Sequence, residues 1–159
     1  MHFEIGPDTS RISNGTLVYR PNDYSFAVEP VPDGGGRSVL IDDLSLEIDK
    51  TGRVITVWGM CPHTRWKVAV LNPPQSDLRE VFFISDSPLT DGASVRFNKP
   101  WWPVSVDSRS GWVCIAGGAT PSSSVEVLPG VILDLTKDRQ LSSLWLRPRE
   151  LPSLAENQL

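Results

Sequence analysis

Cys61 and His63 are the two residues whose types and spacing most directly suggest chemistry. They lie two positions apart in the stretch WGMCPHTRWK, which holds one of the two cysteines and one of the two histidines of the chain. A histidine beside a cysteine can activate the thiol as a nucleophile, provided that a third group orients the histidine. The stretch supplies no such group, and Pro62 is typical of a bend. We therefore interpret these ten residues as a turn between two strands, and keep Cys61 and His63 as weak catalytic candidates.

Metal binding and other enzyme signatures receive little support from the sequence. A structural zinc site needs four ligands, but Cys114 lies in the apolar run WVCIA and His2 lies near the start of the chain. Asp42 and Asp43 could do acid–base work or hold a cation, and we interpret them as solvated residues of a polar face. Residues 34–36 are glycines without the strand-to-helix setting of a phosphate loop. The sequence therefore predicts no metal and no cofactor, and it favours a protein that is not an enzyme.

Tryptophan is the residue type that most favours a binding role. The chain has six tryptophans in 159 residues, and Trp101 and Trp102 are consecutive, with a proline on either side. Neighbours on a strand point to opposite faces, so both cannot enter one core. We expect at least one of them to be exposed or to line a cavity, as tryptophan does in ligand pockets and interfaces. The residues predicted to bind are Trp101, Trp102, Trp66, His63, Arg65 and Lys99.

The charge of the chain is unlike that of most nucleic-acid-binding proteins. The net charge is −4 and the isoelectric point is about 5.1, with lysines and arginines scattered singly among acids. Neither a nucleic acid nor a membrane is an expected partner. Two cysteines are too few for a disulfide framework, and no apolar run approaches the roughly 18 residues of a membrane span. We expect a cytoplasmic protein with free thiols.

Short apolar runs between frequent prolines and glycines predict an all-β fold. The chain has 14 prolines and 12 glycines, and no segment keeps a 3.6-residue apolar stripe for three helical turns. Residues 17–59 can also be laid over residues 104–146 without a gap, at an offset of 87 positions. The pattern predicts an internally duplicated antiparallel β-sandwich or small closed barrel, with two repeats of about 43 residues in a pseudo-twofold relation. The sequence does not choose between sandwich and barrel.

Each repeat contains a long hairpin with one apolar face. Residues 44, 46 and 48 in the first repeat, and 131, 133 and 135 in the second, are Leu, Ile or Val alternating with other residues, as in a half-buried strand. The return strands are expected to place Val54, Thr56 and Trp58 on one face and their counterparts Leu141, Ser143 and Trp145 on the equivalent face. The sequence predicts that Trp58, Trp145 and Trp112 are core residues. The hairpin looks like those of small bacterial β-domains of uncharacterised function, and this resemblance implies neither an activity nor catalytic residues.

The chain is expected to form one domain from residue 1 to 146, with a flexible tail at 147–159. Residues 60–103 would be an insert between the repeats, with strands at 65–71, 80–84 and 94–97. If the repeats mainly supply the scaffold, a specialised binding or catalytic site is expected in this insert.

Three functions are compatible with these observations. The first is a non-catalytic bacterial module that binds another protein, in an accessory, inhibitor or immunity-type role. The alternative is a small β-barrel enzyme or small-molecule binder, whose apolar pocket would be lined by His63 and by four tryptophans at 58, 66, 101 and 102. The third is a homo-oligomer, such as a homodimer, formed through sheet faces or edges.

Overall fold

Residues 1–7 and 14–159 are described by a computed structural model, and in these ranges the regular elements are strands and three short 3-10 helices. The early strands are β1 (His2–Ile5), β2 (Thr16–Arg20), β3 (Ser25–Glu29), β4 (Arg37–Ile41), β5 (Leu44–Ile48) and β6 (Val54–Met60). The middle strands are β7 (Lys67–Val68), β8 (Asp77–Leu78), β9 (Val81–Ile84) and β10 (Ser94–Arg96). The late strands are β11 (Val104–Val106), β12 (Val113–Ala116), β13 (Ser123–Leu128), β14 (Val131–Leu135) and β15 (Leu141–Leu146). The 3-10 helices are η1 (Pro21–Asp23), η2 (His63–Arg65) and η3 (Glu156–Gln158), and none of them is long and apolar enough to pass through a lipid bilayer.

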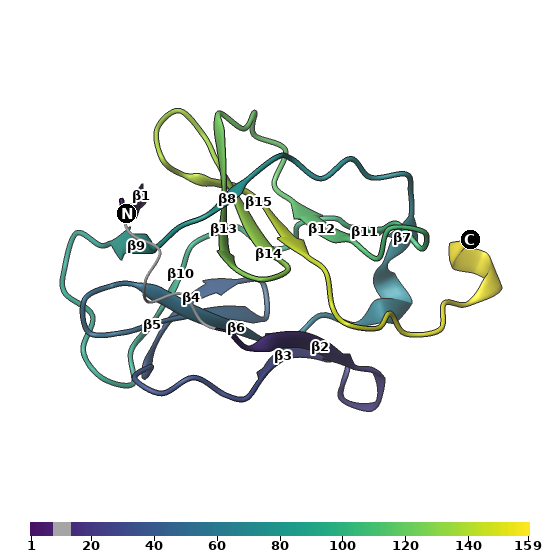
Figure 1. Ribbon diagram of the computed structural model, residues 1–159, viewed down its shortest axis with the longest axis horizontal. Helices are drawn as coiled ribbons and strands as arrows, with labels where there is room; N and C mark the ends of the chain where they lie inside the picture. The colour runs from purple at the N-terminus through teal and green to yellow at the C-terminus, as the bar shows by residue number, and fades with distance from the viewer. Residues whose placement is uncertain (8–13) are drawn as a thin grey trace.

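The strands form three sheets, and none of the sheets in the described ranges closes on itself. A six-stranded sheet has the order β10-β4-β5-β6-β3-β2, a seven-stranded sheet has the order β7-β11-β12-β15-β14-β13-β8, and β1 pairs with β9 (Figure 1). The prediction of an all-β fold is confirmed. Predicted strands at 80–84 and 94–97 correspond to β9 and β10, whereas the region 65–71 contains only the two residues of β7.

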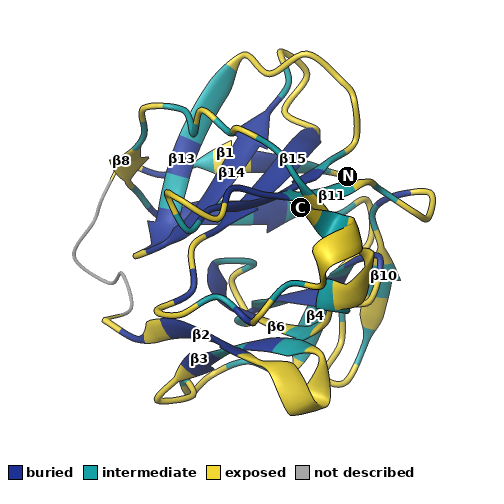
Figure 2. Ribbon diagram, turned by 90° about the vertical axis from the view of Figure 1, so that its right-hand side faces the viewer, coloured by how far each residue is buried: buried dark blue, intermediate teal, exposed yellow. Residues whose placement is uncertain are grey.

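The two large sheets bury their inner faces in one apolar core, in a sandwich-like arrangement (Figure 2). The six-stranded sheet contributes Leu44, Leu46 and Val57, which are at most 1% exposed. The seven-stranded sheet contributes Leu133 and Leu144, which are fully buried. The alternation predicted for both hairpins is therefore confirmed on the outgoing strands β5 and β14.

The two large sheets share their strand order and their pairing register. Within β5 and β6, Leu44 pairs with Gly59, and the register shifts between Glu47 and Ile48. The pairing of β14 with β15 repeats this pattern 87 positions later: Val131 pairs with Leu146, and the register shifts between Asp134 and Leu135. The pairings β2–β3 and β11–β12 also correspond at this offset. Each sheet has a short parallel strand at the equivalent edge, β10 beside β4 and β8 beside β13. The seven-stranded sheet has one more, β7 beside β11, without a counterpart in the six-stranded sheet.

The shift in the hairpin register overturns one prediction from the sequence. A bulge reverses the alternation of side chains along a strand, so Val54 enters the core while Trp58 points away from it. Trp58 is 49% exposed, and its prediction as a core residue is wrong. The same shift places Leu141 in the core and Trp145 on the outer face of the seven-stranded sheet.

The outer face of the seven-stranded sheet is covered by the chain itself. Trp145 and Trp112 lie there in a second apolar cluster, edge to face at 6.2 Å, with Leu71 packed against them. The Leu71 N–H donates to Oδ2 of Asp107 at 3.0 Å, which ties the covering segment to the sheet. Both tryptophans are buried, as predicted, but beneath this segment and outside the main core. Trp58, at the position equivalent to Trp145, has no such cover.

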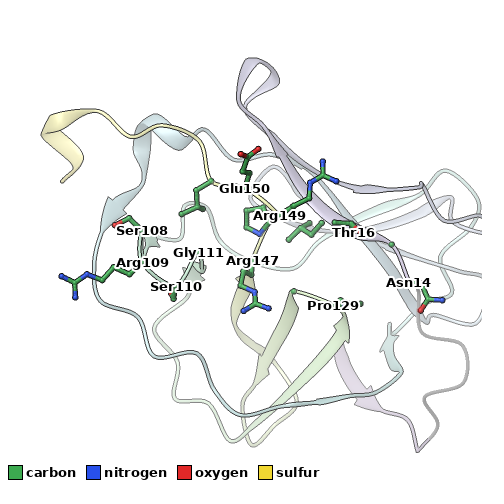
Figure 3. A pocket seen from close by; sticks show the side chains of 15 residues that line it. Asn14, Thr16, Ser108, Arg109, Ser110, Gly111, Pro129, Arg147, Arg149 and Glu150 are labelled. Atoms are coloured by element: carbon green, nitrogen blue, oxygen red, sulfur yellow. The ribbon is translucent and has the colours of Figure 1, made fainter.

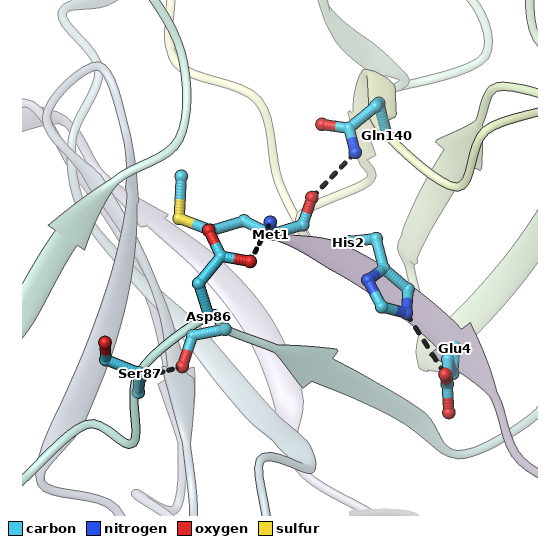
Figure 4. A network of polar contacts seen from close by, with 7 residues as sticks. Met1, His2, Glu4, Asp86, Ser87 and Gln140 are labelled. Atoms are coloured by element: carbon cyan, nitrogen blue, oxygen red, sulfur yellow. Dashed lines mark hydrogen bonds and ion pairs between the residues drawn. The ribbon is translucent and has the colours of Figure 1, made fainter.

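The N-terminal strand connects parts of the chain that are far apart in sequence (Figure 4). The Met1 amino group lies 3.4 Å from Oδ1 of Asp86, and Gln140 donates its side-chain N–H to the Met1 carbonyl at 2.7 Å. Phe3, which follows on β1, is fully buried, and its N–H donates to the Arg139 carbonyl. Strand β1 is therefore held by the seven-stranded sheet's β14–β15 turn as well as by β9.

The C-terminal segment, which the sequence predicts to be flexible, also makes contacts with the fold. Leu151 and Leu154 pack against the core. Gln158 donates to the carbonyls of His63 and Trp66, so this segment reaches the loop that follows β6.

Candidate binding surface

The loop after β6 is organised around the Tyr19 hydroxyl. Tyr19 donates to the Cys61 carbonyl at 2.8 Å and accepts the His63 backbone N–H at 2.9 Å. Burial raises the pKa of Tyr19 well above its usual range, so the hydroxyl keeps its proton. Trp66 packs beneath the loop in the core and is 1% exposed. The centre of its ring lies 4.9 Å from the centre of the Tyr19 ring and 5.8 Å from that of Phe26. These contacts make Trp66 a core residue in a position where the sequence predicts binding.

The Cys61 thiol and the His63 ring have different partners. The Trp66 indole N–H donates to Sγ of Cys61 at 3.4 Å. The His63 ring stacks on Tyr24 at 5.5 Å, and its Nδ1 lies 3.2 Å from the Tyr19 hydroxyl. Burial raises the pKa of the Cys61 thiol to about 11, so the thiol is protonated at neutral pH. The structure thus provides the turn that the sequence predicts, and its contacts give both side chains structural roles.

Cys61 is expected to react with iodoacetamide at pH 8 about a hundredfold more slowly in the folded protein than in the urea-unfolded chain. The reason is that burial raises the thiol pKa to about 11, which leaves about a hundredfold less thiolate at pH 8 than the usual thiol pKa does. Peptide mass spectrometry would follow Cys61 and Cys114 separately, and burial raises the pKa of Cys114 as well. Fast labelling of Cys61 in the folded protein would contradict a structural role and restore it as a candidate nucleophile.

A hollow of about 220 Å³ lies beside this loop, where the two large sheets meet. We call it the tryptophan cleft; it is lined by residues 42–44, 60–62, Arg65, 101–104 and Ile115. Trp101 is 61% exposed at its rim, with the Arg65 guanidinium 5.9 Å from the centre of its ring. Trp102 is half-buried against the core. The prediction that at least one of the consecutive tryptophans is exposed is confirmed.

Asp42, which lines the tryptophan cleft, holds the backbone at Trp102 in place by a hydrogen bond. Its carboxylate accepts the Asn98 side-chain N–H at 2.8 Å and the Trp102 backbone N–H at 3.1 Å. Asp42 is 9% exposed, so its interpretation as a solvated residue is wrong. Asp43, its neighbour, is exposed as predicted. The pair therefore divides into a buried residue that positions Trp102 and a charged residue on the surface.

The exposed apolar surface continues from the cleft onto the outer face of the six-stranded sheet. A second hollow of about 530 Å³ is lined by Trp58, Met60, Asp23 and Asp43, among others. Met60 and Asp43 line both hollows, so the two are contiguous. We call the exposed side chains Tyr24, Trp58, Met60 and Trp101 the aromatic surface; their exposed fractions run from 41% to 61%.

Besides the buried Trp66, the predicted binding residues are only partly brought together by the fold. Trp101, Trp102 and Arg65 come together in the tryptophan cleft. His63 is half-buried in the adjoining loop, and Lys99 is exposed but does not line the cleft. Sequence reasoning missed Trp58, Met60 and Tyr24 as surface residues. The alternation of Trp58 with Met60 along β6 would indicate them once the bulge is known.

No group of three or more His, Cys, Asp or Glu side chains in the described ranges is arranged to hold a metal ion. Comparison with protein families and with curated proteins finds no family model and no relative that matches the chain.

Proposed function

We propose that the protein is a non-catalytic module that holds another protein on its aromatic surface, in an accessory or inhibitory role. The observation that carries this proposal is the exposure of three large apolar side chains, Trp58, Met60 and Trp101, which line two adjoining hollows. Exposed apolar patches rimmed by polar residues mark interaction sites, and tryptophan and tyrosine dominate binding energy at interfaces. Both cysteines are free, buried thiols, which favours a reducing compartment such as the cytoplasm.

The chemistry of the surface favours a partner with an apolar anchor beside a basic residue. Asp23 and Asp43 are exposed around Met60 and Trp58, and neither makes an ion pair within the described ranges. A lysine or arginine of the partner could pair with them while an aliphatic or aromatic side chain covers Met60. Binding fits this surface better than catalysis does, because Cys61 is protonated and Asp42 is occupied with Trp102.

A Trp101→Ala/Met60→Ala variant is expected to bind the partner at least about 30-fold more weakly, since a hot-spot residue contributes about 2 kcal/mol or more. The partner would be captured from the native host's lysate and identified by mass spectrometry, and its affinity would then be measured with purified proteins. A Val31→Ala/Val70→Ala variant is the matched control, because both valines are exposed apolar residues outside the aromatic surface. It should bind like the wild type.

Two outcomes would count against the proposal. A partner held equally by both double variants would place binding elsewhere on the molecule. If the wild type captured no stoichiometric protein, a small apolar ligand in the tryptophan cleft would become the better candidate, because Trp101 and Trp102 both line that hollow. Thermal stabilisation by small aromatic compounds would test that second function.

We also propose that residues 17–59 and 104–146 are copies of one unit, related by a pseudo-twofold axis. The shared strand order, register and bulge position support this origin. On this proposal, positions 87 residues apart occupy equivalent places, so each surface hollow of one half should have a counterpart in the other.

A further inference from the structure

The tryptophan cleft has such a counterpart, formed by the equivalent segments in and beside the two repeats. Its lining segments 42–43, 60–62 and 101–104 correspond, 87 positions away, to 129–130, 147–149 and 14–17. These equivalent segments line a larger hollow of about 740 Å³, together with residues 108–111 and 150–151 (Figure 3). We call this hollow the arginine cleft.

The arginine cleft differs from its counterpart in charge. It is lined by Arg109, Arg147 and Arg149 against the single carboxylate of Glu150, in a chain whose net charge is −4. None of these three guanidinium groups takes part in an ion pair within residues 1–7 and 14–159. The Arg149 guanidinium lies close enough to the Glu29 carboxyl to help lower its pKa, so part of the Arg149 charge is already balanced. The cleft therefore concentrates mainly the positive charge of Arg109 and Arg147.

Hydrogen bonds of the backbone hold the positions from which the arginines project. The Arg147 N–H donates to the Gly130 carbonyl at 2.8 Å, and the Arg149 N–H donates to the Leu17 carbonyl at 2.9 Å. The Arg109 N–H donates to Oδ1 of Asp107 at 3.0 Å. The Arg147 guanidinium also lies over the Trp112 ring, 5.2 Å from its centre. Stacking through its face leaves the N–H groups at the edge of the guanidinium available to a ligand.

We propose that the arginine cleft binds a multivalent oxyanion, a molecule with two or more phosphate or carboxylate groups. Guanidinium groups bind both kinds of group through paired N–H donors. Figure 3 shows Arg147 between Arg109 and Arg149, whose side chains point away from it in different directions. Arg109 comes from one lining segment, and Arg147 and Arg149 come from another. A ligand with several anionic groups can meet more than one of these side chains, and the hollow is larger than a single ion requires.

Isothermal titration calorimetry at low ionic strength would test this site with pyrophosphate, citrate and inorganic phosphate. We expect pyrophosphate or citrate to bind the wild type more tightly than inorganic phosphate, and added salt to weaken binding. The Arg147→Gln/Arg149→Gln variant should bind about a hundredfold more weakly, because each lost charged hydrogen-bonding group costs roughly tenfold. Tighter binding of pyrophosphate than of citrate would assign a phosphorylated ligand, and the reverse order a polycarboxylate.

A Lys50→Gln/Lys137→Gln variant is the matched control, since it removes the same charge from two exposed hairpin turns. It should bind within about twofold of the wild type. Equal affinities of the two double variants would overturn the proposal, as would no binding of any of the three anions to the wild type. If the arginine double variant did not fold, Arg109→Gln, on an exposed turn, would replace it, with roughly tenfold weaker binding expected. The assay contains no protein partner, so its result is independent of the function proposed for the aromatic surface.

Discussion

Replacing Trp66 with alanine is expected to lower the free energy of unfolding by about 4 kcal/mol. The side chain is 1% exposed, and its ring lies against Tyr19 on β2 and Phe26 on β3. Alanine would leave a cavity between them and remove the indole N–H from the Cys61 sulfur. Equilibrium unfolding in urea, followed by far-ultraviolet circular dichroism, would measure the change.

Trp101→Ala is the matched control for this experiment. Trp101 is 61% exposed, so its removal should cost less than about 1 kcal/mol. If Trp66→Ala were no more destabilising than Trp101→Ala, Trp66 would not be the core residue described above. Its prediction as a binding residue would then regain support.

Replacing Asp134 with alanine is expected to cost about 3 kcal/mol of stability. Its carboxylate is 4% exposed and accepts three hydrogen bonds, from the Ser124 hydroxyl at 2.5 Å, the Ser143 hydroxyl at 2.7 Å and the Trp145 indole N–H at 2.8 Å. Alanine would leave these donors without their acceptor, and an unsatisfied buried polar group costs about 1–3 kcal/mol. Urea unfolding measures the loss.

Asp134→Asn would separate hydrogen bonding from packing, because asparagine keeps the size of the side chain and one acceptor oxygen. We expect its stability to lie between those of the wild type and Asp134→Ala. Wild-type stability of the alanine variant would show that the donors find other partners, and would contradict the role given to Asp134.

The sequence predicts the scaffold better than it predicts which face of a strand is covered. Alternation on β5 and β14 correctly places Leu46 and Leu133 in the core, because period-two burial is local to a strand. The bulge adds one residue, Ile55, to β6 opposite the step from Glu47 to Ile48. No glycine or proline marks this position, so its effect on Trp58 could not be read from the sequence. The cover over Trp145 comes from Leu71, a contact between distant parts of the chain.

In the candidate site too, features that depend on neighbouring residues could be predicted, whereas features that depend on distant residues could not. The exposure of Trp101 follows from its place beside Trp102 between two prolines, which is a local pattern. The burial of Trp66 depends on Tyr19 and Phe26, which lie 47 and 40 residues earlier in the chain. The arginine cleft was not predicted, since its arginines come from two separate segments that only the fold brings together.

The distribution of the sheets along the chain has a consequence for synthesis on the ribosome. The six-stranded sheet is complete except for its edge strand β10 once Met60 has been made, but the sheet that covers its inner face ends at Leu146. At about 5–20 residues per second, the ribosome needs roughly 4–17 s to add the residues between them. During this interval Val39, Leu46 and Val57 have no opposing layer, so the nascent chain is open to aggregation and to chaperone binding until translation is nearly finished.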